Sequence, residues 1–419
     1  MQEQAGNHTY SRFSYEKKGT IAPQCYLHFR SLQNYHGAIF TQSFPNFGEL
    51  SSKLKKKFPC TATELRTLAI MKFESITIKD IGKALGLSTS TVSRALRGSY
   101  EISSETKKQV LEYAEKVNYR PNPIALSLKE RKSRSIGVVV CEIANNFFSQ
   151  AINGIESIAY NRGYHVIISQ SHESYDREVV NVQHLASRSV DGLLVSLSCE
   201  TTDLTHFTNL HEKGLPIVFF DRITNEIITH KVIADNYQSA YDTTVHLLRN
   251  GYSRIALIVS APFLSITKER MEGYKTALLD NGLPFDEKLV KNCSHGGMIE
   301  KEIDGALNSL FKMKQKPDAI VAATDRITTC CLTGIKNMGL QIPKDVAVVG
   351  FTNSNIPELF SPTLTTVRLP AFEMGQVAIE LLIDLIESKR PVTEFQTKVL
   401  QSEFVIRESS QALPVMLKV

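Results

Sequence analysis

The sequence predicts an all-α helix-turn-helix head followed by an α/β body of two doubly wound parallel-sheet lobes. Three observations predict it. Two short helical patterns flank a tight turn within residues 77–98, and short apolar runs alternate with helix-length segments over 136–408. Charge also divides the chain, because residues 71–135 carry 13 Lys or Arg against 7 Asp or Glu, whereas 136–419 carry 26 against 32. A basic segment joined to an acidic body is typical of a polyanion-binding module on a separate scaffold.

Composition sets the remaining bounds on class. A chain of 419 residues allows two to four domains. Its 7 cysteines form no C-x-x-C pair, which favours reduced thiols in a cytoplasm. No apolar stretch approaches the ~20 residues needed to cross a bilayer, and the first residues lack the apolar centre of a signal peptide. We therefore expect a cytoplasmic protein with no membrane partner.

The first helix of the head has clear start and stop signals. Thr77 is a candidate N-cap, and Asp80 stands three residues later, which is the spacing of a capping box. Ile81 and Leu85 are four residues apart and share one face. Gly86 is a candidate for the left-handed residue that commonly ends a helix.

The second helix is predicted over 89–97 with Ser88 as its cap, and a third begins at Ser103 or Ser104 and runs to about Val117. Apolar residues of the second helix point inward, which leaves short polar residues and two arginines outside. This outer face suits a recognition helix in a DNA groove. The alternative is a generic three-helix bundle with a polar surface. The outer residues are Thr89, Ser90, Ser93, Arg94 and Arg97.

The body contains seven apolar runs typical of parallel strands that are buried on both faces. Helix-length segments separate them, including 148–163, 175–189 and 237–251, and this alternation predicts parallel sheets covered by helices. Ligands of such folds bind beyond the carboxyl ends of the strands. The seven runs are 136–142, 165–169, 192–197, 216–220, 254–259, 319–323 and 346–351.

Motifs of catalysis are missing from the sequence. We find no phosphate loop, dinucleotide fingerprint, metalloprotease motif or nucleophile elbow, so we expect no catalytic residue, no metal and no cofactor. Two other classes deserve comparison. A free sugar-binding protein would carry an export signal and no head, and an enzyme would turn over candidate ligands, which a regulator would not.

The head resembles the DNA-binding domain of the LacI/GalR (lactose-repressor) family. The resemblance rests on TIKDIGKALGLSTSTVSRALRG and EISSETKKQVLEYAEKVNYRPNPIALSL, with a departure at Gly82, where alanine is usual; we expect this glycine to loosen the first helix by up to about 1 kcal/mol. The resemblance implies a helix-turn-helix DNA-binding domain at 71–120, followed by a hinge helix and linker at 121–135. A hinge leucine, here Leu128, would wedge into the minor groove. The DNA contacts implied are Lys79, Ser88, Thr89, Ser90, Thr91, Ser93, Arg94, Arg97, Asn122, Ala125 and Leu128.

The body resembles the periplasmic-binding-protein-like core that this family shares with sugar-binding proteins. Segments such as PIVFFDR, RMEGYKTAL and SPTLTTVRLP carry the resemblance. It implies an effector-binding and dimerisation domain at 136–408, with lobe 1 at about 136–232 and 351–388 and lobe 2 at about 233–350 and 389–408. The effector contacts implied are Asn146, Phe147, Phe148, Asp221, Arg270 and Asp325.

These residues together predict a transcriptional repressor of the LacI type. A homodimer would bind a near-palindromic operator in double-stranded DNA, under control of a small molecule, most simply a sugar; sugar phosphates and nucleobases remain open. Residues 1–70 have no counterpart in the family, so we expect either translation from Met71 or a flexible basic arm. The tail at 409–419 lacks sustained heptads, which favours a dimer over a tetramer.

Overall fold

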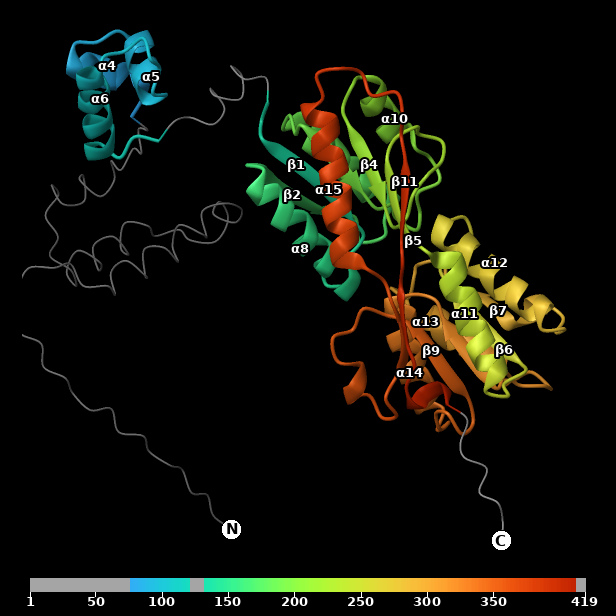
Figure 1. Ribbon diagram of the computed structural model, residues 1–419. Coiled ribbons are helices and arrows are strands. Elements are labelled where there is room, and N and C mark those ends of the chain that lie inside the picture. The colour runs from blue at the N-terminus through green and yellow to red at the C-terminus, as the bar shows by residue number, and fades with distance from the viewer. Residues whose placement is uncertain (1–75, 121–131, 412–419) are drawn as a thin grey trace, which may run out of the picture. The chain divides into compact units, whose positions relative to one another are not determined.

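The computed structural model describes residues 76–120 and 132–411. These belong to two compact units, divided between Arg120 and Pro121. We call the first unit the head and the second the body, and describe each by itself (Figure 1). The expected extra segment 1–70, the start at Met71 and most of the hinge and tail lie outside the described residues. No helix in the described ranges is long and apolar enough to cross a bilayer.

The head is a bundle of α4 (Ile78–Leu85), α5 (Thr89–Leu96) and α6 (Ser104–Lys116). The capping box at α4 forms as expected, because the Thr77 N–H donates to Asp80 Oδ2 at 2.9 Å. Ser103 caps α6 by accepting from the Thr106 N–H. The helices bury a small shared core made of Ile81, Val92, Ala95, Val110 and Ala114.

The glycine at position 82 has a structural reason that the sequence did not reveal. Gly82 is buried, and its carbonyl accepts from the Leu87 N–H at 2.9 Å as the chain turns through Gly86, whose φ is +65°. A Cβ on residue 82 would lie 2.7 Å from the Leu87 carbonyl oxygen. Glycine therefore lets the turn between α4 and α5 close tightly against α4.

Lobe 1 of the body is a six-stranded, wholly parallel sheet in the order β11-β5-β4-β3-β1-β2. Helices α8 and α15 pack together on one face, and α9 and α10 cover the other (Figure 1). The elements are β1 (Ser135–Val140), α8 (Asn146–Asn161), β2 (His165–Gln170), α9 (Tyr175–Ser187), β3 (Gly192–Val195), α10 (Thr205–Glu212), β4 (Ile217–Phe220), β5 (Lys231–Ala234), α15 (Ala371–Glu387) and β11 (Thr397–Leu400).

Lobe 2 is a second six-stranded sheet, in the order β12-β10-β9-β8-β6-β7, with β12 antiparallel to β10 and the rest parallel. Helices α11 and α12 cover one face, and α13 and α14 the other. The elements are α11 (Asn236–Arg249), β6 (Ile255–Val259), α12 (Ser265–Asp280), β7 (Val290–Asn292), α13 (Glu300–Phe311), β8 (Ala319–Ala322), α14 (Asp325–Asn337), β9 (Ala347–Phe351), β10 (Thr365–Arg368) and β12 (Glu403–Val405).

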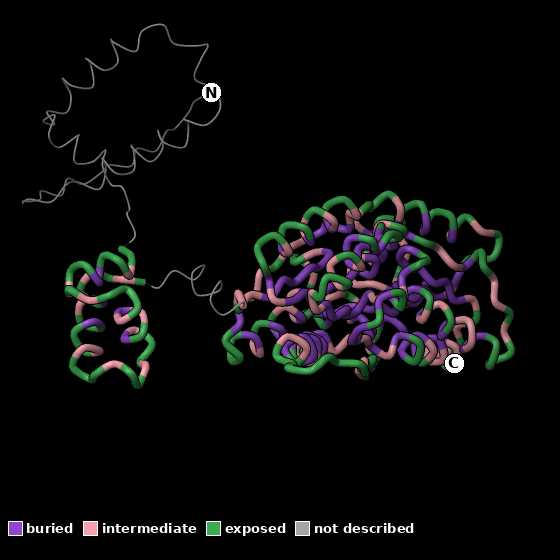
Figure 2. The backbone as a smooth tube through the Cα atoms, turned by 90° about the horizontal axis from the view of Figure 1, so that it is seen from above, coloured by how far each residue is buried: buried purple, intermediate pink, exposed green. Residues whose placement is uncertain are grey.

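The core lies along the two sheets, as the purple tube in the interior of the body shows (Figure 2). Successive residues of β1 face opposite sides of the sheet: Val138 and Val140 pack under α8 and α15, whereas Val139 packs under α9 and α10. Because helices cover both faces, residues 136–140 of β1 are all buried and none carries a polar side chain, so the run shows no polar alternation. All seven predicted apolar runs are strands.

The chain crosses between the lobes three times, after β5, after β10 and after β11. The expected boundaries at 351 and 389 were therefore wrong. Strand β10 continues the sheet of lobe 2 to Arg368, and β11 returns to lobe 1 beside β5. Asp235 joins the first and third crossings, because its carboxylate accepts from the Ser402 N–H at 2.8 Å.

Candidate functional site

The outer face of α5 presents the polar side chains that the sequence predicted. Ser88 Oγ accepts from the Thr91 N–H at 3.1 Å and lies 2.8 Å from the Thr91 hydroxyl. This cap fixes the start of the helix, while Val92 and Ala95 anchor its inner face in the head core. The predicted contacts that are exposed are Lys79, Ser88, Thr89, Ser90, Arg94 and Arg97, and Thr91 and Ser93 are half-buried.

Arg94 is already engaged within the head. Its guanidinium forms an ion pair with Glu101 at 3.0 Å, and both side chains are about half exposed. An exposed pair of this kind contributes roughly 0.2–1 kcal/mol, so a base or phosphate can displace it. The predicted hinge contacts Asn122, Ala125 and Leu128 lie outside the described residues.

In the body, polar side chains gather where the parallel strands of both lobes end. Glu142 follows β1, Glu173 follows β2, and Asp221 with Arg222 follows β4. From lobe 2, Asp325 follows β8 and Thr352 follows β9. The carboxyl edge of a parallel sheet is where such folds bind ligands. These ends face one another and enclose two adjoining cavities between the lobes.

The larger cavity, which we call the inner chamber, has a volume of about 50 Å³. Aromatic rings from both lobes contribute to its wall, and Phe147 and Phe148 meet edge to face with centroids 5.2 Å apart. Its other lining residues come from the ends of strands and helices of both lobes. The chamber is lined by Asn145, Phe147, Phe148, Asp221, Arg222, Ile266, Arg270, Thr324, Asp325, Phe351, Thr352, Asn353 and Leu369.

Arg270, on α12, is buried at the chamber wall and only partly satisfied. Its Nε donates to Asn236 Oδ1 at 3.0 Å, and its Nη1 donates to the Ala323 carbonyl. The guanidinium lies over the ring of Phe351, 4.5 Å from the centroid. Its Nη2 is buried with no hydrogen-bond partner. Burial lowers the pKa of Arg270 to about 10, so it remains charged at neutral pH with a donor unused.

The two aspartates of the inner chamber are buried carboxylates. Burial raises the pKa of Asp221 despite the nearby charges of Arg222 and Arg270. Burial also raises the pKa of Asp325, against the hydrogen bond that its carboxylate accepts from Thr352. Asp221 holds a left-handed backbone with φ of +58°, which is uncommon for a residue with a side chain and is typical of functional sites. Both carboxylates retain capacity to accept hydrogen bonds from a ligand.

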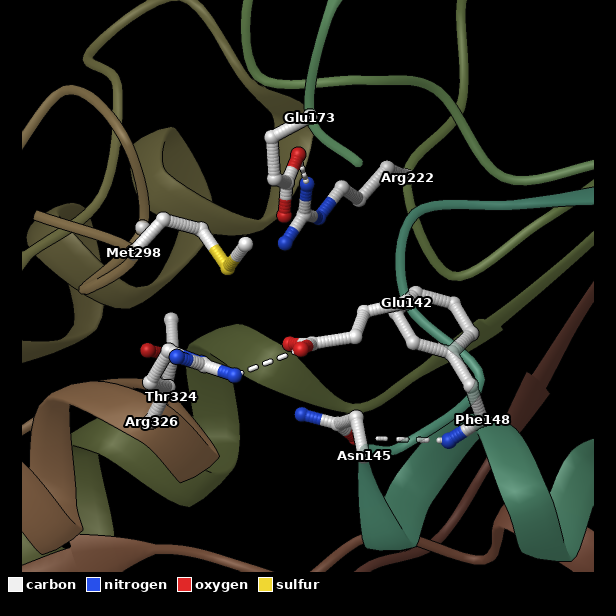
Figure 3. A pocket seen from close by; sticks show the side chains of 9 residues that line it. Glu142, Asn145, Phe148, Glu173, Arg222, Met298, Thr324 and Arg326 are labelled. Atoms are coloured by element: carbon white, nitrogen blue, oxygen red, sulfur yellow. Dashed lines mark hydrogen bonds and ion pairs between the residues drawn. The ribbon is translucent and has the colours of Figure 1, made fainter. Parts of the chain in front are cut away.

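The smaller cavity, which we call the outer chamber, has a volume of about 30 Å³ and shares four wall residues with the inner one. Arg222 donates to Glu173 at 2.7 Å, and Glu173 also accepts from the Cys199 N–H at 2.8 Å. Although burial opposes its ionisation, these contacts hold the pKa of Glu173 below its ordinary value. The chamber is lined by Glu142, Asn145, Phe148, Glu173, Arg222, Gly296, Met298, Thr324 and Arg326, most of which Figure 3 shows.

Five of the six predicted effector residues therefore line one cavity. The exception is Asn146, which is exposed and absent from both linings. Its neighbour Asn145 takes the place in the wall, because Asn145 Oδ1 accepts from the Phe147 N–H at 2.9 Å as the cap of α8. Sequence reasoning missed Arg222, although it stands beside Asp221 in the same strand end. It also missed Glu142, Glu173, Met298, Thr324, Arg326 and Asn353.

Comparison with known proteins places these sites in context. Residues 77–122 match the model of the bacterial regulatory proteins of the lacI family, and residues 244–410 match a periplasmic binding protein-like domain. The chain is 31% identical over 336 residues to the HTH-type transcriptional repressor PurR of Aliivibrio fischeri (strain MJ11), covering 79% of this chain and 98% of that relative. A second PurR, from Vibrio atlanticus, is 31% identical, covering 75% and 92%.

Solved structures show the same architecture. The transcriptional regulator CelR in complex with cellobiose is 29% identical, with a TM-score of 0.60, covering 80% of this chain and 99% of that one. A LacI family regulator from Enterococcus faecium with bound ribose is 29% identical, with a TM-score of 0.58, covering 67% and 99%. The lac repressor dimer bound to operator, at 23% identity and a TM-score of 0.68, shares the fold over 81% of this chain and 100% of its own.

Proposed function

Because the chain belongs to the lacI family of bacterial regulatory proteins, we propose that it responds to a sugar bound in the inner chamber. As a member of that family it is a sequence-specific DNA-binding transcriptional regulator, and the sugar is its small-molecule effector. The observation that carries this proposal is the unpartnered Nη2 of buried Arg270 at the chamber wall that also holds Asp221 and Asp325. A free donor beside two buried acceptors suits a ligand whose hydroxyls both accept and donate.

The aromatic wall supports the same ligand class. Phe148 lines both chambers and Phe351 closes the inner one, so an apolar surface faces the charged groups. A sugar ring offers carbon-bound hydrogens on its face and hydroxyls at its rim, which matches such a wall. The relatives with bound cellobiose and ribose are consistent with this choice. A ligand that extends from one chamber into the other would contact the residues that line both chambers, which are Asn145, Phe148, Arg222 and Thr324.

On the DNA side, helix α5 enters the major groove. Thr89 and Ser90, near its N-terminus, contact base edges, while Ser93, Arg94 and Arg97 contact bases and backbone. Lys79 lies near the groove, and Ser88 and Thr91 fix the start of the recognition helix. In the hinge, Asn122, Ala125 and Leu128 meet the minor groove, with Leu128 as the wedge. Phosphate contacts from lysine and arginine make binding strongly dependent on salt.

The regulator works as a homodimer in the cytoplasm, where its operator lies. Two heads bind the two halves of a near-palindromic site, and sugar binding changes the angle between the lobes of each body. The change alters operator affinity by the coupling free energy between the two sites, typically about 1–3 kcal/mol.

The test is genomic binding-site selection with the full chain at fixed salt, with and without a panel of neutral sugars. Enrichment of a near-palindrome that shifts with one sugar supports the proposal. Operator binding that responds to no sugar but to a nucleobase would reject the sugar while leaving the regulator intact.

A further inference from the structure

Each of the two guanidiniums at the outer chamber donates to a carboxylate through one nitrogen, whereas the buried Nε of Arg222 has no hydrogen-bond partner. Arg326 Nη2, from lobe 2, donates to Glu142 Oε1 of lobe 1 at 2.5 Å. Arg222 Nη1 donates to Glu173 Oε2 at 2.7 Å. In Figure 3 these pairs lie on opposite sides of the chamber, with the Met298 side chain between them. An anion entering here would meet two arginines that already hold carboxylates.

Counted over both chambers, carboxylates outnumber guanidiniums. Glu142, Glu173, Asp221 and Asp325 line the chambers, against Arg222, Arg270 and Arg326. Both members of the Glu142–Arg326 pair act on the chamber, because burial mainly raises the pKa of Asp325, while the charge of Arg326 lowers it and the charge of Glu142 raises it by less. The side chain of Glu142 is only 14% exposed, so solvent screens it weakly.

We propose that Glu142 is a specificity-determining residue that excludes phosphorylated and other anionic sugars from the cleft, which confines the effector to neutral sugars. The inference rests on the proposed sugar-binding function and deepens it. A phosphate carried by a sugar in the inner chamber would extend into the outer chamber beside Glu142 and Glu173. Like charges brought together in a partly desolvated site repel one another strongly, so the site would discriminate against anionic ligands by repulsion.

The Glu142–Arg326 ion pair also opposes the binding of a phosphate group. It joins the two lobes, so it favours the closed cleft as well as occupying the cation. To serve a phosphate, Arg326 would have to release Glu142, which would leave that carboxylate facing the anion and remove a contact between lobes. A neutral hydroxyl demands neither change. The pair therefore discriminates by charge rather than by size alone.

The test compares the full chain with Glu142→Gln, which keeps the shape of the side chain and removes its charge. Isothermal titration would use D-ribose, D-glucose, D-galactose, D-fructose, the terminal phosphate esters of these sugars, and inorganic phosphate. The matched control is Glu156→Gln, on the exposed face of α8 and outside both linings. The double variant Glu142→Gln/Arg326→Gln removes the cation that the first variant releases.

We expect the wild-type protein to bind a neutral sugar and to bind its phosphate ester at least about tenfold more weakly. In Glu142→Gln the ratio of the Kd of the phosphate ester to the Kd of the neutral sugar should fall at least about tenfold, while the Kd of the neutral sugar itself changes less. The double variant should restore the preference for the neutral sugar. Wild-type binding of the ester as tightly as the sugar, or an unchanged ratio in Glu142→Gln, would overturn the inference.

Two further arms keep the test decisive. If no sugar binds, the sugar proposal fails, and inorganic phosphate then decides the inference: binding to Glu142→Gln but not to wild type supports it, and equal binding overturns it. If Glu142→Gln does not fold, Arg326→Gln replaces it. That variant leaves Glu142 unpaired in the chamber, so the preference against phosphate must grow; a weaker preference would overturn the inference.

Discussion

Replacing Arg270 with methionine separates its contribution to folding from its contribution to ligand binding. Burial lowers its pKa from 12.5 to about 10, so keeping the guanidinium charged costs about 3 kcal/mol at any pH below that value. This group is a base with a lowered pKa, so the cost is present at neutral pH and disappears only above pH 10. Against it stand the hydrogen bonds to Asn236 and the Ala323 carbonyl, each contributing roughly 1.5–3 kcal/mol because the donor is charged.

These opposing contributions nearly cancel in the protein without ligand. Arg270→Met should therefore change the free energy of unfolding by less than about 3 kcal/mol, measured by chemical denaturation. Effector affinity should behave differently, because the unpartnered Nη2 has its role only when a ligand is present. Loss of one charged hydrogen bond predicts a rise in Kd of roughly 10- to 150-fold, measured by titration calorimetry.

Arg270→Lys is the matched control, because it keeps the charge and loses the planar arrangement of donors. It should retain fold stability and bind with intermediate affinity. An unchanged Kd in Arg270→Met would refute the assignment of Arg270 as an effector contact. A loss of stability above about 4 kcal/mol would show that its burial is structural.

Three further predictions concern the cleft, the head and the crossings between the lobes. Burial raises the pKa of Asp221, so the stability contributed by its protonated carboxyl is present at low pH and is lost as the pH rises through that pKa. Asp221→Asn should abolish this loss. A plot of Tm against pH between pH 4 and pH 8 should then be flatter for the variant than for the wild type. Ser88→Ala removes the acceptor for the Thr91 N–H and should destabilise the head by about 1 kcal/mol, whereas exposed Ser90→Ala should weaken operator binding with a stability change within about 0.5 kcal/mol. Asp235→Ala removes the hydrogen bond between the first and third crossings. The coupling free energy between effector and operator binding should then change by roughly 0.5–2 kcal/mol, while the protein still binds both ligands. An unaltered coupling free energy would show that the crossings do not transmit the signal.

The strands that the sequence predicted and the strands that it missed differ in how apolar their residues are. Six of the seven apolar runs form strands that are buried along most of their length, and the seventh, β2, lies at a sheet edge and is only partly buried. Strands β5, β7, β10, β11 and β12 were missed because each has only three or four residues and none is apolar throughout. Strands β7, β11 and β12 lie at sheet edges and are largely exposed. Strand β10 is an inner, buried strand, but its sequence TTVR is mostly polar, and the edge strand β11 is exposed. Neither carries the apolar run that would have placed the lobe boundaries.

The candidate site likewise contains residues that the sequence predicted and residues that it did not. Arg270 and Asp325 were predicted because they stand in segments that resemble the family. Glu173 was missed although it follows the predicted run 165–169, and Met298 was missed because it follows the three-residue edge strand β7, which the sequence did not predict. Their place in the cleft depends on which strand ends face each other, and that is a property of two lobes packed together rather than of any local segment.

The place where the linker joins the body constrains how a signal can reach the DNA. Residues 132–134 run directly into β1 and are held to lobe 1, because the Ser133 and Arg134 N–H groups donate to Asp191 at 2.7 and 2.9 Å. The cleft lies at the opposite, carboxyl end of β1, where Glu142 and Asn145 follow the strand.

Closure of the cleft moves lobe 2 against lobe 1, but the linker is attached to lobe 1 alone. Within a single chain, closure therefore leaves the point of attachment of the head unchanged relative to its own lobe. Coupling between two sites requires an element whose arrangement differs between the two states. In the proposed homodimer that element is the pair of lobes 1, whose separation changes when each moves against its own lobe 2. A monomeric variant should accordingly bind effector with normal affinity and show operator binding that effector does not alter; coupling preserved in a monomer would contradict this mechanism.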